Sequence, residues 1–541
     1  MKTITFFIAL LLSITTFAQW TTETDVNTLV TDHTSNDMKA ISTSDGYTYV
    51  VYWKETDLEL RLQVLDLNGN KLLGSNGSLI TNTIPMNSYT VYWSTVVDKD
   101  DNLYVGVTAT GDSTGYVFKL DIDGNHLWGT NGVALGSAYL PTVLPLESGE
   151  AIISWIPGNQ SFMQKYDTDG NPVWNNPQEV VSGSSKTAPA NLFELSNGDY
   201  ILVFHSYFTG VSSTLYAQRY NSDGDAQWAS PTQLSDKSTA YNKYYSGLQI
   251  DDTIYFGYYA STSTRFDSFL QRINEDGSLP WGINGIDFDI EETDNELDTS
   301  IAYQAGSQYI WAICNMANGN QAEIGEYVQK FDKDTGARQF SEYAKELYPI
   351  STEHNKHTSS LYIIENKPFF VVSKGNDDGV SPTLLEAVML DNDGDFLWAE
   401  ESKAFASFSA NKKRTHLLKP TNGQAVVVFV ENKASGLNIY AQNFMDPDLV
   451  LATDKYNTDH TPVVFPNPSK GVFNFKFDNS IMEDVQIAIY NSVGNLVFFT
   501  DTINTEENSI KLDLRKLPFG SYFYQINGVH FNTNGKILIL K

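Results

Sequence analysis

The chain has 541 residues, a formal net charge of −30 and a single cysteine. This length exceeds what one ordinary hydrophobic core supports, so we expect several domains or a repeat architecture. The negative charge lies almost entirely in residues 19–460, whereas residues 461–541 are neutral, and such an acidic surface argues against nucleic acid and anionic lipid as partners. Because Cys314 is alone, no intramolecular disulfide can form, and its apolar surroundings predict that it packs in the core.

The first 18 residues have the features of a cleavable secretory signal peptide. Lys2 precedes a mostly apolar run at 4–14, and Ala18 supplies the small residue expected before the cleavage site. The apolar run is well short of the roughly 20 residues that cross a bilayer, and no later segment has the required length and character. We therefore expect residues 1–18 to be removed during export, and we expect no transmembrane segment.

A turn motif recurs along the acidic part of the chain, and YDTDGNPVW at 166–174 is typical of it. Seven copies place their glycines 46 to 59 residues apart, with a large apolar residue four positions after each glycine. The glycines are Gly69, Gly124, Gly170, Gly224, Gly277, Gly336 and Gly394, and the apolar residues are Leu73, Trp128, Trp174, Trp228, Trp281, Phe340 and Trp398. Alternating segments and hairpin turns flank each copy, which predicts about four antiparallel strands per repeat, as in a β-propeller blade.

An eighth copy, at residues 413–448, contains only three of the four expected strands. The N-terminal segment 19–32 resembles the missing strand, with Trp20 in the place of Trp228. We therefore expect the N-terminal strand to complete the last blade, which would remove the exposed edges of an open array. The predicted fold is all-β: an eight-bladed propeller over residues 19–448, with seven blades as the alternative.

The repeated turn has two interpretations. In the structural one, the first Asp or Asn caps backbone NH groups, the glycine takes a positive φ, and the large ring wedges between neighbouring blades. In the other, the turn oxygens bind calcium, and the candidate ligands are Asp121, Asp123, Asp167, Asp169, Asp391 and Asp393. A full EF-hand loop needs further oxygens and a bidentate glutamate that no copy supplies. The structural interpretation is therefore favoured, calcium stays open as a ligand, and no other cofactor is predicted.

The turn resembles the repeats of quinoprotein propellers, whose blades carry an Asp…Thr-Gly turn followed by Trp; residues 332–336 with Phe340 are the nearest copy. The resemblance implies a propeller over most of residues 19–448. Those dehydrogenases often place adjacent cysteines at a quinone site, which this chain cannot do, so their activity is not predicted. The turn is also similar to the Asp-box of sialidases, but Arg219 and Arg272 occupy equivalent repeat positions, which suggests a structural role rather than a substrate site.

Residues 463–541 follow a polar linker at 449–462 and read as a small β-sandwich. The stretch closely resembles the type A C-terminal sorting domain of the type IX secretion system of Gram-negative bacteria. The residues that carry the resemblance include Pro466, Asn467, Pro468, Gly471, Gly494, Gly520, Tyr522 and Lys536. The resemblance implies contact with the type IX secretion machinery, passage through the outer membrane and cleavage of the domain. The product would be released or attached to the outer face of that membrane.

No motif elsewhere predicts a reaction. His354 and His357 are interpreted as loop histidines, and the acidic run 287–298 as a solvated loop rather than an ion-binding insertion. Two functions therefore stay open. One is a non-catalytic propeller that binds glycan or protein at the cell surface. The other is a secreted carbohydrate-active enzyme, which predicts Asp or Glu with His or Arg at one mouth of the central channel.

Overall fold

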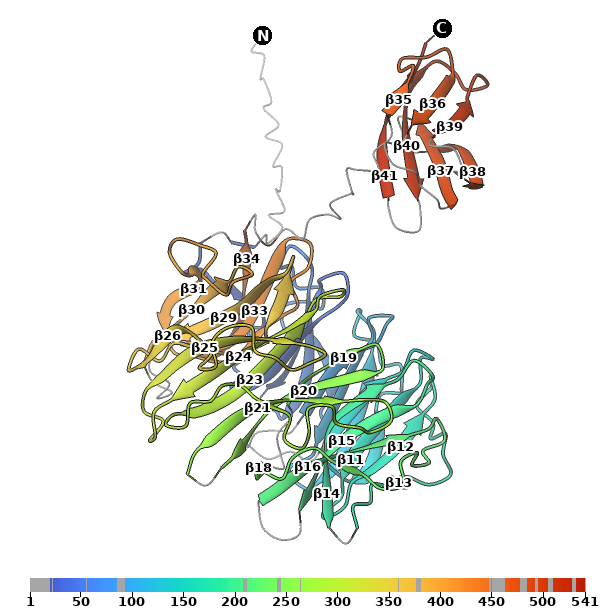
Figure 1. The fold of residues 1–541 in the computed structure, drawn as a ribbon. Coiled ribbons are helices and arrows are strands. Elements are labelled where there is room, and N and C mark those ends of the chain that lie inside the picture. Colours follow the sequence, from blue (N-terminus) through green and yellow to red (C-terminus); the bar gives the residue numbers. More distant parts are fainter. Residues whose placement is uncertain are drawn as a thin grey trace, which may run out of the picture. The chain divides into compact units, whose positions relative to one another are not determined.

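The computed structural model describes residues 20–540 except for short gaps, and no α-helix occurs among the described residues (Figure 1). The gaps are 22, 55, 85–92, 184, 208–211, 241–244, 263, 359, 376–380, 447–448, 450–462, 477–483, 492–494, 505–508 and 528–531. The predicted signal peptide and Gly494 lie outside the described residues. The chain divides into two compact units, one up to residue 449 and the other from residue 450.

The first unit contains eight antiparallel sheets, and seven of them are built from consecutive strands. The first three are β2 (Met38–Ser42), β3 (Thr48–Lys54), β4 (Glu59–Leu65) and β5 (Ser78–Thr81); β6 (Trp93–Val97), β7 (Leu103–Thr108), β8 (Thr114–Leu120) and β9 (Val133–Ser137); and β10 (Tyr139–Pro145), β11 (Ala151–Ile156), β12 (Phe162–Tyr166) and β13 (Gln178–Glu179).

The next four sheets follow the same up-and-down order. They are β14 (Lys186–Glu194), β15 (Tyr200–Tyr207), β16 (Ser212–Tyr220) and β17 (Thr232–Gln233), with β18 (Thr239–Ala240) also on β16; β19 (Ser246–Ile250), β20 (Thr253–Ser261), β21 (Phe266–Ile273) and β22 (Ile286–Asp287); β23 (Asn295–Tyr303), β24 (Tyr309–Ala317), β25 (Ile324–Asp332) and β26 (Lys345–Ser351); and β27 (Lys356–His357), β28 (Tyr362–Ile364), β29 (Lys367–Lys374), β30 (Thr383–Met389) and β31 (Lys403–Ala410).

The eighth sheet combines both ends of the unit. Its strands β32 (Lys412–Leu417), β33 (Gln424–Lys433) and β34 (Gly436–Met445) are followed in space by β1 (Thr28–Leu29), which pairs with β34 in the register Thr28 to Ala441. The paired strand is shorter than the predicted 19–32 segment. However, Glu23 also accepts a hydrogen bond from the Gln442 side chain at 3.0 Å, so the segment before β1 is held on the same sheet.

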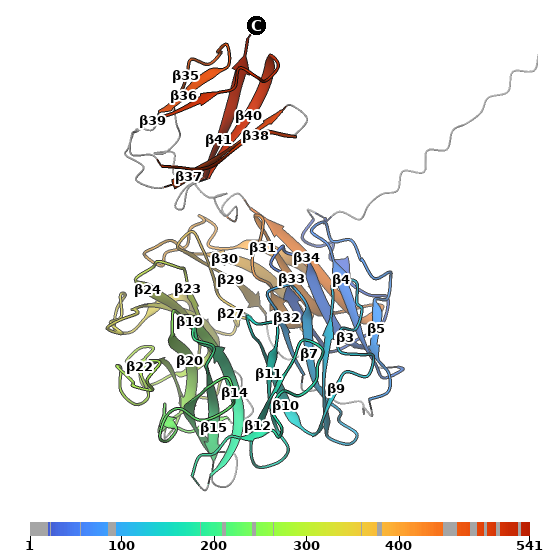
Figure 2. The same cartoon turned by 90° about the vertical axis from the view of Figure 1, so that its right-hand side faces the viewer.

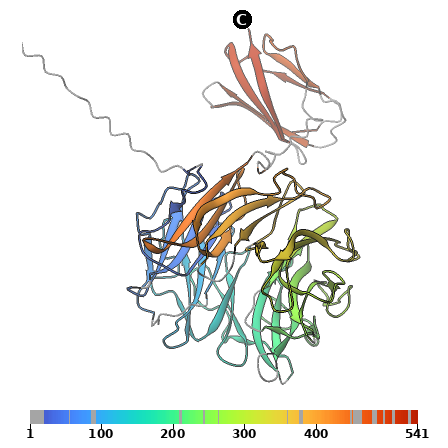
Figure 3. The same ribbon diagram turned by 90° about the vertical axis from the view of Figure 1, so that its left-hand side faces the viewer.

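Neighbouring sheets pack face to face, and this explains the composition of their strands. The second strands of the first four sheets, β3, β7, β11 and β15, are buried almost throughout, because both of their faces lie against other sheets. Such strands require continuous apolar runs rather than alternation. The first and last sheets lie side by side (Figures 2 and 3). They share a core in which Val50 and Tyr52 of β3 meet Val428 and Val430 of β33.

The first strands of neighbouring sheets contact one another, including β2 with β6, β6 with β10, β19 with β23, and β2 with β32. These first strands therefore lie beside one another, and side chains of β2, β6, β10 and β32 border one cavity. The linker prediction is wrong at its first residue. Leu449 is fully buried in the core formed by the seventh and eighth sheets, because its apolar side chain packs there with Phe405 and Phe444.

The second unit consists of two sheets that share one core. Their orders are β35 (Val463–Phe465), β36 (Val472–Lys476) and β39 (Ser509–Asp513), and β38 (Leu496–Asn504), β37 (Asp484–Asn491), β40 (Gly520–Asn527) and β41 (Asn532–Ile539). Phe475 of one sheet and Tyr524 of the other lie edge to face with ring centroids 5.0 Å apart. Inward-facing apolar residues from both sheets complete this core, as expected of a sandwich.

Candidate functional site

The repeated turns bind their own backbone. In the copy at 166–174, Asp167 Oδ1 accepts hydrogen bonds from the backbone NH groups of Asp169 at 3.0 Å and Asn171 at 2.8 Å. These bonds lower the pKa of Asp167, and the largest contribution comes from the Asn171 backbone. Gly170 has a φ of 83°, a conformation that glycine adopts without a steric penalty.

The six calcium candidates are divided among three separate turns. Asp121 and Asp391 make the same backbone contacts as Asp167, and Asn125 directs its Nδ2 donor, not an oxygen, at Asp121. Among the described residues, no group of three or more His, Cys, Asp or Glu side chains is placed to hold a metal ion. The geometry of the turns is that of caps.

The large apolar residue after each turn lies against the glycine of the turn in the next repeat, and in most repeats it is an aromatic ring. A Cβ added to Gly170 would lie 2.7 Å from Cγ of Trp128, and the Trp128 indole donates to the carbonyl of Thr168 at 3.0 Å. The corresponding indole bonds to the next turn are Trp20 to Leu67 at 2.9 Å, Trp174 to Ser222 at 3.2 Å, Trp228 to Glu275 at 3.1 Å and Trp281 to Asp334 at 3.3 Å. Trp20 therefore contacts the first turn in the same way as Trp228 contacts the turn of the repeat that follows it.

Trp398 packs with Phe444 and Leu449 at the end of the eighth copy, where the NH of Leu449 donates to the carbonyl of Asp446 at 2.9 Å. Its ring lies 6.0 Å from that of Phe444, and the Lys403 ammonium lies 4.2 Å from its centroid. Arg219 and Arg272 also link neighbouring repeats. Arg219 Nη1 contacts Glu275 Oε1 at 2.7 Å, and Arg272 Nη1 donates to the Asp334 carbonyl at 2.8 Å.

A glutamine clamp was missed at the sequence level. The side chain of Gln164 donates to the carbonyl of Trp174 at 3.0 Å and accepts from its NH at 3.3 Å, so it holds the ring-bearing segment. Equivalent glutamines occur in five other sheets: Gln63, Gln218, Gln271, Gln329 and Gln442. The shared Gln in segments such as FMQKY and FLQRI was the available signal. In the eighth sheet the clamp holds the N-terminal segment.

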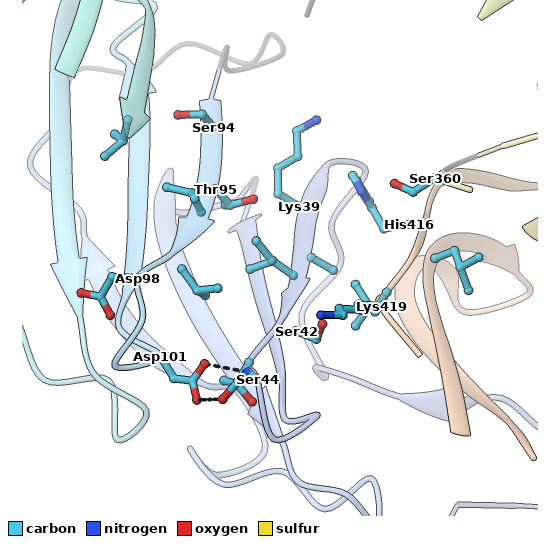
Figure 4. A pocket seen from close by; sticks show the side chains of 18 of the residues that line it. Lys39, Ser42, Ser44, Ser94, Thr95, Asp98, Asp101, Ser360, His416 and Lys419 are labelled. Atoms are coloured by element: carbon cyan, nitrogen blue, oxygen red, sulfur yellow. Dashed lines mark hydrogen bonds between the residues drawn. The ribbon is translucent and has the colours of Figure 1, made fainter. Parts of the chain in front are cut away.

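A cavity of about 880 Å³ lies where the first strands β2, β6, β10 and β32 and the segment before β28 come together. Its wall combines apolar side chains, such as Ile41, Val96 and Val97, with the hydroxyl groups of Ser42, Thr43, Ser44, Ser94, Thr95, Thr142 and Ser360. The Ser94 hydroxyl donates to the Pro141 carbonyl at 2.6 Å. Figure 4 shows the side chains of Lys39, His416 and Ser360 directed toward this space. Ser360 and His416 also border a second cavity of about 450 Å³, which Asp298 and His357 help to line.

The carboxylates of the larger cavity are occupied by other partners. Asp98 Oδ2 lies 3.1 Å from Lys119 Nζ, and both side chains are buried. Asp101 accepts hydrogen bonds from the backbone NH and the hydroxyl of Ser44, both at 2.6 Å (Figure 4). Two free carboxylates flanking one bond, as glycoside hydrolysis requires, are therefore not found on the described part of this wall.

The prediction that His357 is a loop histidine is wrong. His357 lies in β27, is 6 % exposed, and its Nδ1 lies 2.9 Å from Glu326 Oε1 on β25. Burial lowers the pKa of His357, but the adjacent Glu326 carboxylate outweighs this and raises it above its usual value. Because a buried charge needs a partner, the carboxylate and the imidazole hold each other inside. His354 lies in the preceding turn with a φ of 54°.

The prediction of a solvated loop at 287–298 is also wrong in part. Asp289 and Glu296 are each only 1 % exposed. Burial is the main cause that raises the pKa of Glu296 to about 10 and that of Asp287 to about 7, and neighbouring carboxylates add to both shifts. Backbone carbonyls of this run accept hydrogen bonds from Arg265 and Arg338, which fold it against the neighbouring strands.

Several sorting-signal residues are brought together in the second unit. Asn467 accepts from the NH of Leu538 at 2.9 Å and donates to the carbonyl of Lys536 at 2.8 Å, so it ties the segment around Pro466 and Pro468 to β41. Gly471 has a φ of 101°, and Tyr522 donates its hydroxyl to the Pro518 carbonyl at 2.7 Å. Gly520 begins β40.

The second unit also defines the class of protein. Residues 463–540 match the family described as secretion system C-terminal sorting domain. This match supports the prediction of a type IX secretion cargo, destined for secretion and for the outer membrane or cell surface. No helix in the described part of the chain is long and apolar enough to cross a membrane.

Comparison with particular proteins adds little. No curated protein matches the sequence. The α-L-arabinanase of Penicillium chrysogenum, solved with arabinobiose, has a TM-score of 0.32 and 12% identity over 57% of this chain and 93% of its own. Drosophila semaphorin 2a has a TM-score of 0.37 and 10% identity over 81% and 94%. A prolyl endopeptidase has a TM-score of 0.40 and 15% identity over 75% of this chain, which spans 54% of that enzyme.

These scores are too low to carry an argument about function. The resemblance of the repeated turn to quinoprotein propellers receives no support from these structures and stays a prediction.

Proposed function

We propose that the chain is an exported β-propeller that binds a glycan in its central cavity without cleaving it. The observation that carries the proposal is the cavity of about 880 Å³ on the first strands, whose wall combines hydroxyl groups with apolar side chains. Its size falls in the range of small-molecule sites, roughly 300–1,000 Å³. Serine and threonine hydroxyls both donate and accept, which suits the hydroxyl groups of a sugar.

The proposal includes the architecture and the domain plan. We interpret the eight sheets as eight blades in a ring that the N-terminal segment closes. Contacts between the first and last repeats support closure: Asn422 of the last hairpin donates to the Asp45 carbonyl of the first at 3.2 Å. Residues 1–18 would be the signal peptide, 19–449 the propeller, and 463–541 the sorting domain that delivers it to the cell surface or the medium.

The binding function is tested by measuring saccharide affinity of the mature chain by calorimetry, with a cavity-filling variant beside it. Thr95 lines the cavity (Figure 4), so Thr95→Trp is expected to abolish binding. Val173→Trp adds the same ring at a side chain that is 45 % exposed on a repeat turn and serves as the matched control. Equal binding by both variants would contradict the proposal.

A second candidate function, a carbohydrate-active enzyme, is favoured by one observation. Asp298 lines the smaller cavity together with His357 and His416, and this is the combination of side chains expected at the mouth of a catalytic channel. Release of reducing ends from a bound glycan, lost in Asp298→Asn, would favour the enzyme over the binding module.

A further inference from the structure

Lys39 is an unusual lysine in this molecule. Its side chain extends into the central cavity (Figure 4), yet within the described chain its ammonium makes no ion pair or hydrogen bond. Other enclosed lysines are paired: Lys412 lies 3.0 Å from Glu431, and Lys119 lies 3.1 Å from Asp98. A cation that faces a cavity without a counter-ion is a site for an anion.

The surroundings of Lys39 are positive in an otherwise acidic unit. Asp37, a carboxylate that interacts electrostatically with Lys39, is engaged by Arg414, with Oδ1 and Nε 3.5 Å apart. Burial is the main cause that raises the pKa of Asp37, and Arg414, Lys39 and Lys413 oppose the rise. Three cations therefore face one carboxylate where β2 meets β32. A concave site with low-dielectric walls concentrates such a field.

His416 is the polar neighbour that does not carry charge. Burial lowers its pKa to about 3, and the positive charges of Lys39 and Arg414 contribute to the shift. The imidazole is therefore neutral at physiological pH. A hydrogen bond to the Met38 backbone engages its N–H and opposes the shift, so the other ring nitrogen is left to accept a hydrogen bond. Ser360 borders the same two cavities. Both side chains can hydrogen-bond to hydroxyl groups of a ligand, and neither carries a charge of its own.

We infer that the glycan bound in the central cavity is acidic, and that its carboxylate or sulfate group is held by Lys39, while His416 and Ser360 are neutral hydrogen-bond partners for the sugar hydroxyls. This inference rests on the proposed glycan-binding function and gives its ligand a chemical class. An ammonium–anion contact in a partly enclosed site is stronger than a neutral hydrogen bond. Its formation also supplies Lys39 with the counter-ion that the protein does not provide.

The test is calorimetric titration of the mature chain with three probes: a trigalacturonate, its methyl ester, and a sulfated galactose trisaccharide. The wild-type chain is expected to bind at least one of the two acidic probes tenfold or more tightly than the uncharged ester, and the two acidic probes distinguish carboxylate from sulfate. Lys39→Met is expected to remove that preference, whereas Lys39→Arg retains most of it. Lys237→Met removes the same charge from a lysine that does not line the cavity and is expected to change affinity less than twofold.

The outcomes separate this inference from the proposed function. Equal affinity for acidic and neutral probes would overturn the role of Lys39 and leave glycan binding intact. A preference for acidic probes that survives in Lys39→Met, or that is lost in Lys237→Met, would overturn the assignment to this side chain. Failure of the wild-type chain to bind any of the three probes, or any neutral saccharide, would overturn both. A melting curve of Lys39→Met that matches the wild type excludes misfolding as the cause of lost binding.

Discussion

Replacement of Trp20 by alanine tests whether the N-terminal segment closes the ring. Trp20 packs against the first repeated turn, where a Cβ added to Gly69 would meet its ring at 2.8 Å, and its indole donates to the Leu67 carbonyl at 2.9 Å. It belongs to the core shared by the first and last sheets. Trp228 makes the same two contacts within the array, with Gly277 and the Glu275 carbonyl. Trp228→Ala is therefore the matched variant.

The expected loss follows from these contacts. The ring of Trp20 is partly buried, and half of the area that an aromatic side chain usually buries is roughly 100 Å². That area corresponds to about 2.5 kcal/mol, and the indole hydrogen bond adds about 1 kcal/mol. Together the two contributions are about 3.5 kcal/mol. A unit of ~430 residues unfolds with an entropy near 0.9 kcal/mol per kelvin, so this loss should lower the melting temperature by about 4 °C.

The assay is thermal unfolding of the mature chain followed by circular dichroism, with both variants measured in the same buffer. Trp20→Ala and Trp228→Ala should lower the midpoint by similar amounts. A normal midpoint for Trp20→Ala beside a reduced one for Trp228→Ala would refute the reasoning. In that case the N-terminal segment would not act as part of the last blade.

Four further outcomes are expected. Gly170→Ala should destabilise the fold by about 1–3 kcal/mol more than Gly129→Ala. Both glycines have positive φ, but only the first lies under a tryptophan ring, so equal losses by denaturant titration would contradict the wedge. The pKa of Glu296 is higher in the folded protein than in the unfolded chain, so this residue lowers the free energy of unfolding as pH rises above ~4.5. Glu296→Gln should therefore raise the melting temperature more at pH 9 than at pH 5. An equal rise at both pH values would contradict a buried neutral carboxyl. Lys412→Met removes one cationic partner of the enclosed Glu431 and should lower the free energy of unfolding by about 3–5 kcal/mol. Adding Glu431→Leu should restore part of that stability. No restoration in the double variant would mean that the loss has another cause. Adding a calcium chelator should leave the melting curve unchanged, because the turn carboxylates are already bound to backbone NH groups; a lower midpoint would restore calcium as a ligand.

The charged network around Glu431 shows why part of the fold was not predictable. Asn27 donates to both oxygens of Glu431, at 3.2 and 3.0 Å, and Lys412 and Lys433 lie 3.0 and 2.9 Å from them. The first and last members of this network are about 400 residues apart in the chain. The N-terminal strand was predictable from its similarity to the fourth strand of another repeat, but no local pattern predicts which buried charges it meets.

The candidate site was less predictable than the fold for the same reason. His357 and the run 287–298 have polar flanks that favour a loop, and only the adjacency of Glu326 or of Arg265 and Arg338 buries them. Lys39 is one lysine among many in the sequence. Its importance depends on the absence of a partner among the described residues around the cavity, which is a property of the packed sheets rather than of β2.

The sequence by itself determined the strands, the turns and the sorting domain, because alternation, turn chemistry and the motifs around Pro466 and Gly471 act over a few residues. Only the tertiary structure decided what the centre of the propeller-like unit contains. Lys39, Ser360 and His416 come from distant repeats, and their convergence depends on how the first strands of the sheets meet. Local sequence patterns specify each repeat, whereas the chemistry of the cavity arises only where the repeats face one another.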